Sequence, residues 1–163
     1  MGYSTQPETW VDVCKVPING RLSISDSMYF FDYPVIVSLP HAIYSVSVRY
    51  QGDDAARIVA AVRVSQDHSV RRAREIGQVM VDFARIAICD RDRAEAEFEK
   101  LGNDGMSVYF DALDSTEHAY LITLPQGTVI AITGTGPGDG EYPVYMLASN
   151  DSLAAGIEVV FSI

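Results

Sequence analysis

Alternation of apolar and polar residues along residues 41–50, HAIYSVSVRY, limits the folds open to this chain more than any other feature. One face of this segment is apolar or aromatic: Tyr44, Val46, Val48 and Tyr50. The residues between them are Ser45, Ser47 and Arg49, so the period is that of a half-buried β-strand. Residues 57–65, RIVAAVRVS, repeat the pattern after the turn-forming QGDDAA segment. Together they predict an antiparallel hairpin.

Further short apolar segments bounded by Gly, Pro, Asp or Asn predict more strands along the chain. They lie at residues 18–26, 33–39, 76–83, 84–90, 106–113, 119–124, 128–134, 141–148 and 156–162. The break between 76–83 and 84–90 falls near Asp82. About ten closely spaced strands in a chain of this length predict one domain over residues 1–163. The expected class is mainly β (α+β), an antiparallel β-sandwich or a partly open barrel.

One helix is expected around residues 91–101. Asp90 can accept hydrogen bonds from the amides of the first turn, and Gly102 suits a left-handed C-cap. Ala94, Phe98 and Leu101 form one apolar stripe. The helix therefore docks on a sheet by that stripe and leaves its acidic side in water.

Charge and composition exclude several classes of partner. Twenty-two acidic residues against 12 basic ones give a net charge of -10, which disfavours nucleic acid and anionic membranes as partners. No apolar segment approaches the ~20 residues of a bilayer span, and the N-terminus lacks the pattern of a secretory signal. Cys14 and Cys89 show no metal-ligand spacing and are expected to be reduced thiols. We therefore expect a cytoplasmic protein.

The sequence shows no catalytic machinery of a recognisable type. His41, His68 and His118 do not have metal-binding spacing, and no Gly-x-Ser-x-Gly or phosphate-loop motif is present. No serine, cysteine or threonine is accompanied by a visible activating base. These patterns favour a non-catalytic protein without a cofactor or a bound metal.

Carboxylates are the more informative candidates. Asp26 ends a predicted strand, Asp82 and Asp90 flank FARIAIC, and Asp139 lies in the glycine-rich segment with Tyr142 nearby. If the fold gathered them, they could bind a divalent cation or form an acid and base pair. The alternative is that each carboxylate forms a turn or a helix cap.

Two other segments have simple structural interpretations. Arg71, Arg72 and Arg74 are expected to protect a solvated strand edge by charge. The segment 134–145, GTGPGDGEYPVY, precedes a β-type segment rather than a helix, so we interpret it as a tight turn that aims the last two strands into the core.

Three segments resemble the bacterial domain-of-unknown-function family 4241. They are VPINGRLSISD, which ends at Asp26, VDFARIAICD, which contains Asp82 and Asp90, and GDGEYPVY, which contains Asp139 and Tyr142. The last is similar to the family's C-terminal Gly-Asp-Gly-x-Tyr-Pro-x-Tyr signature. The chain differs from the family pattern at Pro137 and at Arg74-Glu75, as a divergent member would. The resemblance implies a β-rich cytosolic domain and no established reaction.

Three classes of function follow from these patterns. The first is a cytosolic protein-binding module, specifically an immunity protein that inhibits a bacterial toxin. A basic surface of the toxin would bind acidic residues of this chain such as Asp53, Asp54, Glu95 and Glu99. The alternative is a small ligand-binding or metal-binding hydrolase-like protein with Asp82, Asp90, Asp139 and Tyr142 around one pocket. The third is a homo-oligomeric module that pairs through an exposed strand edge.

Overall fold

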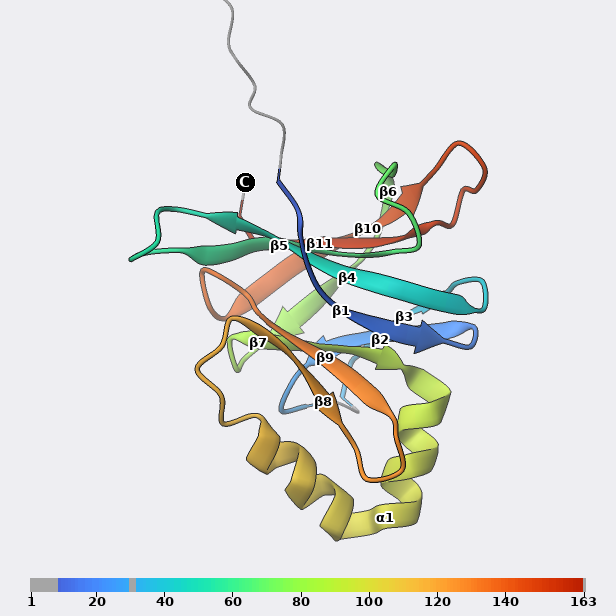
Figure 1. Cartoon of the computed structure of the whole chain (residues 1–163), viewed down its shortest axis with the longest axis vertical. Coiled ribbons are helices and arrows are strands. Elements are labelled where there is room, and N and C mark those ends of the chain that lie inside the picture. The colour runs from blue at the N-terminus through green and yellow to red at the C-terminus, as the bar shows by residue number, and fades with distance from the viewer. Residues whose placement is uncertain (1–8, 30–31, 163) are drawn as a thin grey trace, which may run out of the picture.

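The computed structural model describes residues 9–29 and 32–162 and shows three layers (Figure 1). Two antiparallel sheets stack face to face, and one long helix covers the outer side of the second sheet. The sheets do not close into a barrel. This arrangement confirms the predicted α+β sandwich.

The first sheet, sheet A, has six strands, and the second, sheet B, has five. Sheet A has the strand order β1 (Val11–Ile18), β4 (Ala42–Gln51), β5 (Ile58–Ser65), β11 (Gly156–Val160), β10 (Gly140–Ala148) and β6 (Arg71–Val81). Sheet B has the order β3 (Val35–Ser38), β2 (Arg21–Asp26), β7 (Arg85–Asp90), β9 (Val129–Gly134) and β8 (Ala119–Thr123). The predicted hairpin is β4 and β5, paired from Ser45↔Ser65 to Gln51↔Ile58. Strand β1 was not predicted from the sequence.

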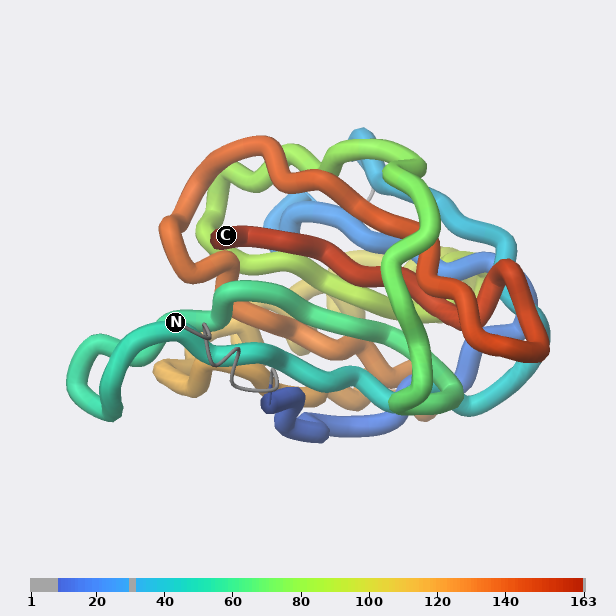
Figure 2. Tube along the Cα trace, turned by 90° about the horizontal axis from the view of Figure 1, so that it is seen from above, coloured from blue at the N-terminus to red at the C-terminus, as the bar shows by residue number. Residues whose placement is uncertain are grey.

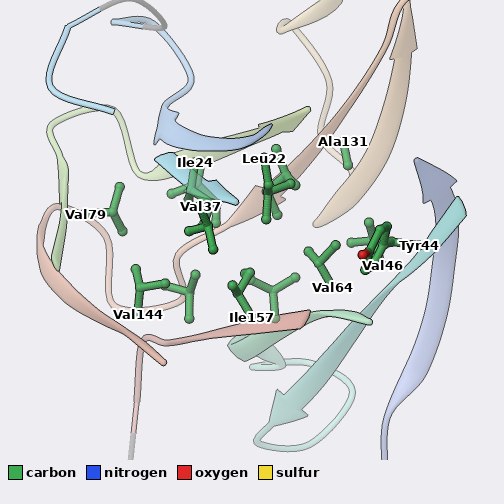
Figure 3. Close-up of a cluster of buried hydrophobic side chains, with 14 of the residues drawn as sticks. Leu22, Ile24, Val37, Tyr44, Val46, Val64, Val79, Ala131, Val144 and Ile157 are labelled. Carbon is green, nitrogen blue, oxygen red and sulfur yellow. The ribbon is translucent and has the colours of Figure 1, made fainter. Parts of the chain in front are cut away.

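The main core lies between the two sheets. Alternate residues of each strand point inward, as the period of two requires. Figure 3 shows the side chains of sheet B facing those of sheet A across this core. Those labelled from sheet B are Leu22, Ile24, Val37 and Ala131, and those from sheet A include Tyr44, Val46, Val64, Val144 and Ile157.

Helix α1 (Arg91–Ala112) is longer than predicted and bends at Gly102, whose φ of 55° and ψ of -137° interrupt the helical backbone. The predicted helix 91–101 is therefore its first half. The predicted strand at 106–113 is wrong, because residues 103–112 form the second half. Met106, Tyr109 and Leu113 recur at helical spacing, and Tyr109 is fully buried with its ring edge-on to Phe98, 5.6 Å between centroids.

The chain crosses between the sheets four times, at residues 19–20, 39–41, 82–84 and 135–139, and the last two crossovers lie side by side. Residues 82–84 connect edge strand β6 of sheet A to β7 of sheet B, and residues 135–139 connect β9 of sheet B to β10 of sheet A. Seen from above, the β4–β5 hairpin and the β10–β11 connection extend at opposite sides of the molecule (Figure 2). These two neighbouring crossover segments position the candidate site.

Candidate functional site

Two carboxylates hold the first crossover segment by its backbone. Asp26, the last residue of β2, accepts hydrogen bonds at Oδ2 from the amides of Asp82 and Phe83, at 2.6 and 2.9 Å. Asp139 accepts one at Oδ1 from the next amide, that of Ala84, at 2.9 Å. Three successive loop amides are therefore bound by side chains from two other parts of the chain.

The second oxygen of Asp26 also has backbone partners. Its Oδ1 accepts from the amide of Met28 at 2.8 Å and from that of Tyr29 at 3.3 Å. The Asp26 side chain is buried, with 4% of its residue surface exposed. A buried carboxylate that serves four amides organises the fold, and its oxygens are not left free for a metal ion. The predicted turn role of Asp26 is confirmed.

The glycine-rich segment closes this junction from the sheet A side. The Thr135 amide donates to the Ala84 carbonyl at 3.1 Å, and the Thr135 hydroxyl donates to the Gly138 carbonyl at 2.5 Å. Gly136 has a φ of +57°, and a Cβ there would lie 2.3 Å from the Val59 carbonyl oxygen. The segment is a tight turn pressed against β5, and no helix follows it.

Tyr142 has a structural place beside the same turn. Its hydroxyl donates to the Gly138 carbonyl at 2.7 Å, and its ring meets that of Phe161 edge-on, 5.1 Å between centroids. Burial raises the pKa of its phenol above the ordinary value. A buried phenol that is committed to a carbonyl is poorly suited to move a proton.

The four predicted ligand or acid–base residues do not form one cluster. Asp82, Asp139 and Tyr142 flank the two crossover segments, but Asp90 lies at the far end of β7. There Asp90 caps α1, because its Oδ1 accepts from the Arg93 amide at 3.1 Å, while Oδ2 accepts from the Asn19 amide at 2.5 Å. Within residues 9–29 and 32–162, no group of three or more His, Cys, Asp or Glu side chains could hold a metal ion.

Two depressions flank the 82–84 segment. The first, of about 270 Å³, is lined by Asp26, Tyr29, Asp32, Tyr33, Met80 and Asp82. The second, of about 460 Å³, is lined by Met28, Phe83, Ala84, Arg85, Phe110, Leu113 and Asp114. The two depressions form one surface, because residues that line one are next in the chain to residues that line the other. These neighbours are Met28 and Tyr29, and Asp82 and Phe83. We call this surface the acidic–aromatic surface.

Large apolar side chains stand exposed over the acidic–aromatic surface. The exposed fractions are 87% for Tyr33, 52% for Tyr29, 54% for Met80, 47% for Phe83 and 38% for Phe110. Exposed aromatic and methionine side chains grouped around depressions are typical of surfaces that bind another protein.

The charged lining of this surface is effectively acidic. Asp32, Asp82 and Asp114 are exposed. The single base in the two linings is Arg85, whose guanidinium donates to the carbonyls of Leu113 and Ser115 and to the Tyr120 hydroxyl. Four aspartates outnumber this one guanidinium in the two linings, so the net charge here is negative.

Asp26 and Asp82 were predicted from the sequence as candidate site residues, but the aromatic part of this surface was not. A usable signal is present in β6, where Met80 falls on the polar side of the alternation, between buried Val79 and Val81. Phe83 gives a second signal, because a large apolar residue in a three-residue turn does not lie on a strand that could bury its side chain.

The acidic residues predicted for partner binding lie in two separate places. Asp53 and Asp54 are exposed in the turn of the β4–β5 hairpin. Glu95 and Glu99 lie on the first half of α1, on the opposite side of the molecule in Figure 1. Glu95 is also paired with Arg91, Nε to Oε1 at 2.6 Å. These four acids do not make one continuous surface.

No family model, curated protein or solved structure matches the chain. In the part of the chain that the structure describes, no helix combines the length and apolar character needed to cross a membrane.

Proposed function

We propose that the chain is a non-catalytic protein-binding module whose acidic–aromatic surface binds a basic protein partner. The observation that carries this proposal is the group of exposed Tyr, Met and Phe side chains around a loop held rigid by Asp26 and Asp139. Aromatic anchors on a preorganised loop lose little conformational entropy on binding, and acidic neighbours select a basic partner.

In its specific form the proposal is an immunity protein that inhibits a bacterial toxin in the cytoplasm. The net charge of -10 supports a basic protein partner over nucleic acid. Cys14 and Cys89 are free thiols, which suits a reducing compartment. Membership of the bacterial domain-of-unknown-function family 4241 stays a prediction, and the hydrolase-like alternative loses support because Asp90 lies apart and Tyr142 is occupied.

The test is co-expression with the product of the neighbouring gene in a bacterial host. We expect survival of the cells and a stable one-to-one complex, measured by size-exclusion chromatography with light scattering. Phe83→Ser and Tyr33→Ala should each weaken the complex at least about tenfold, the loss typical of a truncated aromatic anchor.

A matched control uses the other acidic site. Asp53→Lys with Asp54→Lys should leave the affinity within about threefold, because the hairpin turn lies away from the acidic–aromatic surface. Loss of the complex in this double variant, with Phe83→Ser unaffected, would place the partner on the hairpin and overturn the assignment. If the cells are not protected and no complex forms, the inhibitor proposal is wrong. Self-association of this chain in light scattering would support the homo-oligomeric module instead.

A further inference from the structure

A polar ladder crosses the outer face of sheet A, the face turned away from sheet B. Strand register aligns one residue from each of five neighbouring strands: Asp12 of β1, Ser47 of β4, Arg63 of β5, Glu158 of β11 and Tyr145 of β10. The inward-pointing neighbours of Glu158, Ile157 and Val159, belong to the main core. A charged pair at the centre of a sheet contributes little to folding by itself, so the ladder calls for another explanation.

Glu158 is fully buried and is held between two arginines. Arg63 donates through Nε to its Oε1 at 2.5 Å, and Arg72 donates through Nε to its Oε2. The Trp10 ring covers the Arg63 guanidinium, 4.3 Å from its carbon to the ring centroid. These contacts fix the Arg63 side chain, of which 15% is exposed. The guanidinium is therefore oriented before any ligand arrives.

A depression of about 390 Å³ opens beside this fixed guanidinium. It is lined by Trp10, Asp12, Ser47, Arg63, Ser65, His68 and Val70. Its volume falls in the range of about 300 to 1,000 Å³ found for small-molecule sites. Trp10 and Val70 supply apolar wall, and the remaining residues supply polar groups.

Two of these polar groups have no partner. The terminal nitrogens of Arg63 and the hydroxyl of Ser65 make no hydrogen bond to any residue within 9–29 or 32–162, and Ser65 is 4% exposed. By contrast, Ser47 donates to Asp12 Oδ1 at 2.7 Å, and His68 Nε2 lies 3.6 Å from Asp12 Oδ2. A free guanidinium edge and the free Ser65 hydroxyl, both in the lining of the depression, suit an oxyanion that accepts from both.

We propose that this depression binds a small organic monocarboxylate with an aromatic or apolar body. The carboxylate would accept from Arg63 and Ser65, and the body would lie against Trp10 and Val70. The charges of Arg63 and Arg72 are balanced by Glu158 and Asp12, so the site is close to neutral. A phosphate dianion would meet more repulsion from Asp12 than a monocarboxylate does.

The probe is benzoate, added to the full chain and followed through the side chain of Trp10. Because Trp10 is the sole tryptophan, its indole N–H gives one cross-peak in a proton–nitrogen correlation spectrum. We expect a saturable shift with a Kd of about 10 mM or tighter, the affinity that ligand efficiency allows for nine heavy atoms. Benzamide, the neutral analogue, should bind at least about tenfold more weakly, and phenyl phosphate should not bind more tightly than benzoate.

Variants separate the site from non-specific binding. Arg63→Gln should lose at least about tenfold in benzoate affinity. Arg57→Gln, at the turn end of the same β4–β5 hairpin where Arg57 stacks on Tyr50, should change nothing. Asp12→Asn, at an exposed position that does not endanger folding, should tighten benzoate binding about threefold by removing a like charge. Any of three results would overturn the proposal. They are equal affinity for benzamide and benzoate, tighter binding of phenyl phosphate than of benzoate, and an unchanged affinity for benzoate in both Arg63→Gln and Asp12→Asn.

Discussion

At the scale of single residues, three buried carboxylates bind backbone amides: Asp26, Asp90 and Glu97. Asp26 serves four amides, Asp90 serves one at the start of α1 and one in the β1–β2 turn, and Glu97 serves two in the β8–β9 turn. Each joins segments far apart in the sequence. When its acceptor is removed, a buried amide keeps its desolvation penalty without a compensating hydrogen bond. Substitutions at these carboxylates should therefore be among the single changes that lower the free energy of unfolding most.

Replacing Asp26 tests this directly. Asp26→Ala leaves four amides without their acceptor and should lower the free energy of unfolding by about 4 kcal/mol, whereas Asp26→Asn, which retains one acceptor oxygen, should cost about half as much. Urea unfolding measures both. The matched control is Asp82→Asn, because the exposed Asp82 takes part through its amide, and its change should stay within about 0.5 kcal/mol. Equal effects at the two positions would contradict the role of Asp26.

Glu97 gives a pH-dependent version of the same test. Burial raises the pKa of its carboxyl, but hydrogen bonds from the amides of Gln126 and Thr128, with Arg93 nearby, outweigh burial and leave the pKa below its usual range. Because the folded pKa lies below the unfolded value of about 4.3, the stabilisation is complete above that value and is lost as the pH falls through the folded pKa.

The expected result is a stability difference between wild type and Glu97→Gln that is constant near neutral pH and shrinks below about pH 4.3. Thermal unfolding across this pH series measures it. Glu99→Gln, on the same helix but at an exposed position, is the matched control and should change the free energy of unfolding by less than about 0.5 kcal/mol at neutral pH. A stability difference between wild type and Glu97→Gln that grows towards acidic pH would show that the pKa of Glu97 is shifted in the opposite direction.

At the scale of elements, α1 shows how far local pattern predicts structure. The N-cap at Asp90 was predicted from residue type and is present; Gly102 was predicted to be a left-handed C-cap, and it has the positive φ but bends the helix instead of ending it. The strand predicted at 106–113 failed because MSVYF contains β-branched and aromatic residues, whose preference is weak and yields to packing. Tyr109 decides the outcome, since its hydroxyl reaches the Ser27 carbonyl at 2.6 Å only from a helix that packs on sheet B.

The bend at Gly102 should depend on glycine. Its φ and ψ lie in a region that other residues rarely adopt, while a Cβ there would meet nothing within 4 Å. Gly102→Ala should therefore cost about 1 to 3 kcal/mol through backbone strain alone. Chemical denaturation measures the loss, and Asn103→Ala, at the exposed neighbour, should be neutral or slightly stabilising. A neutral Gly102→Ala would mean that the helix straightens without cost.

At the scale of the whole molecule, the sequence predicted a β-sandwich or a partly open barrel but not how the strands are joined. Alternation in β4 and β5 identifies the strands because burial repeats with period two. Strand order depends on contacts between distant segments, and no local pattern encodes the pairing of β5 with β11. The convergence of Asp26, residues 82–84 and Asp139 was equally hidden, although all three segments were singled out by their resemblance to one family.

That junction fastens sheet A to sheet B where the chain crosses twice, so it should open only when the domain unfolds. We expect the amides of Asp82, Phe83 and Ala84 to exchange with deuterium as slowly as central strand amides, although they belong to a loop. The Ser69 amide is the matched control, because it also bonds a carboxylate, Asp67 at 2.8 Å, but at an exposed position, and it should exchange fast. Asp139→Ala, which removes the acceptor, should accelerate exchange of the Ala84 amide selectively, since the other two amides keep Asp26. Fast exchange of all three amides in the wild type would show that the loop opens locally, and it would remove the rigidity on which the acidic–aromatic surface depends.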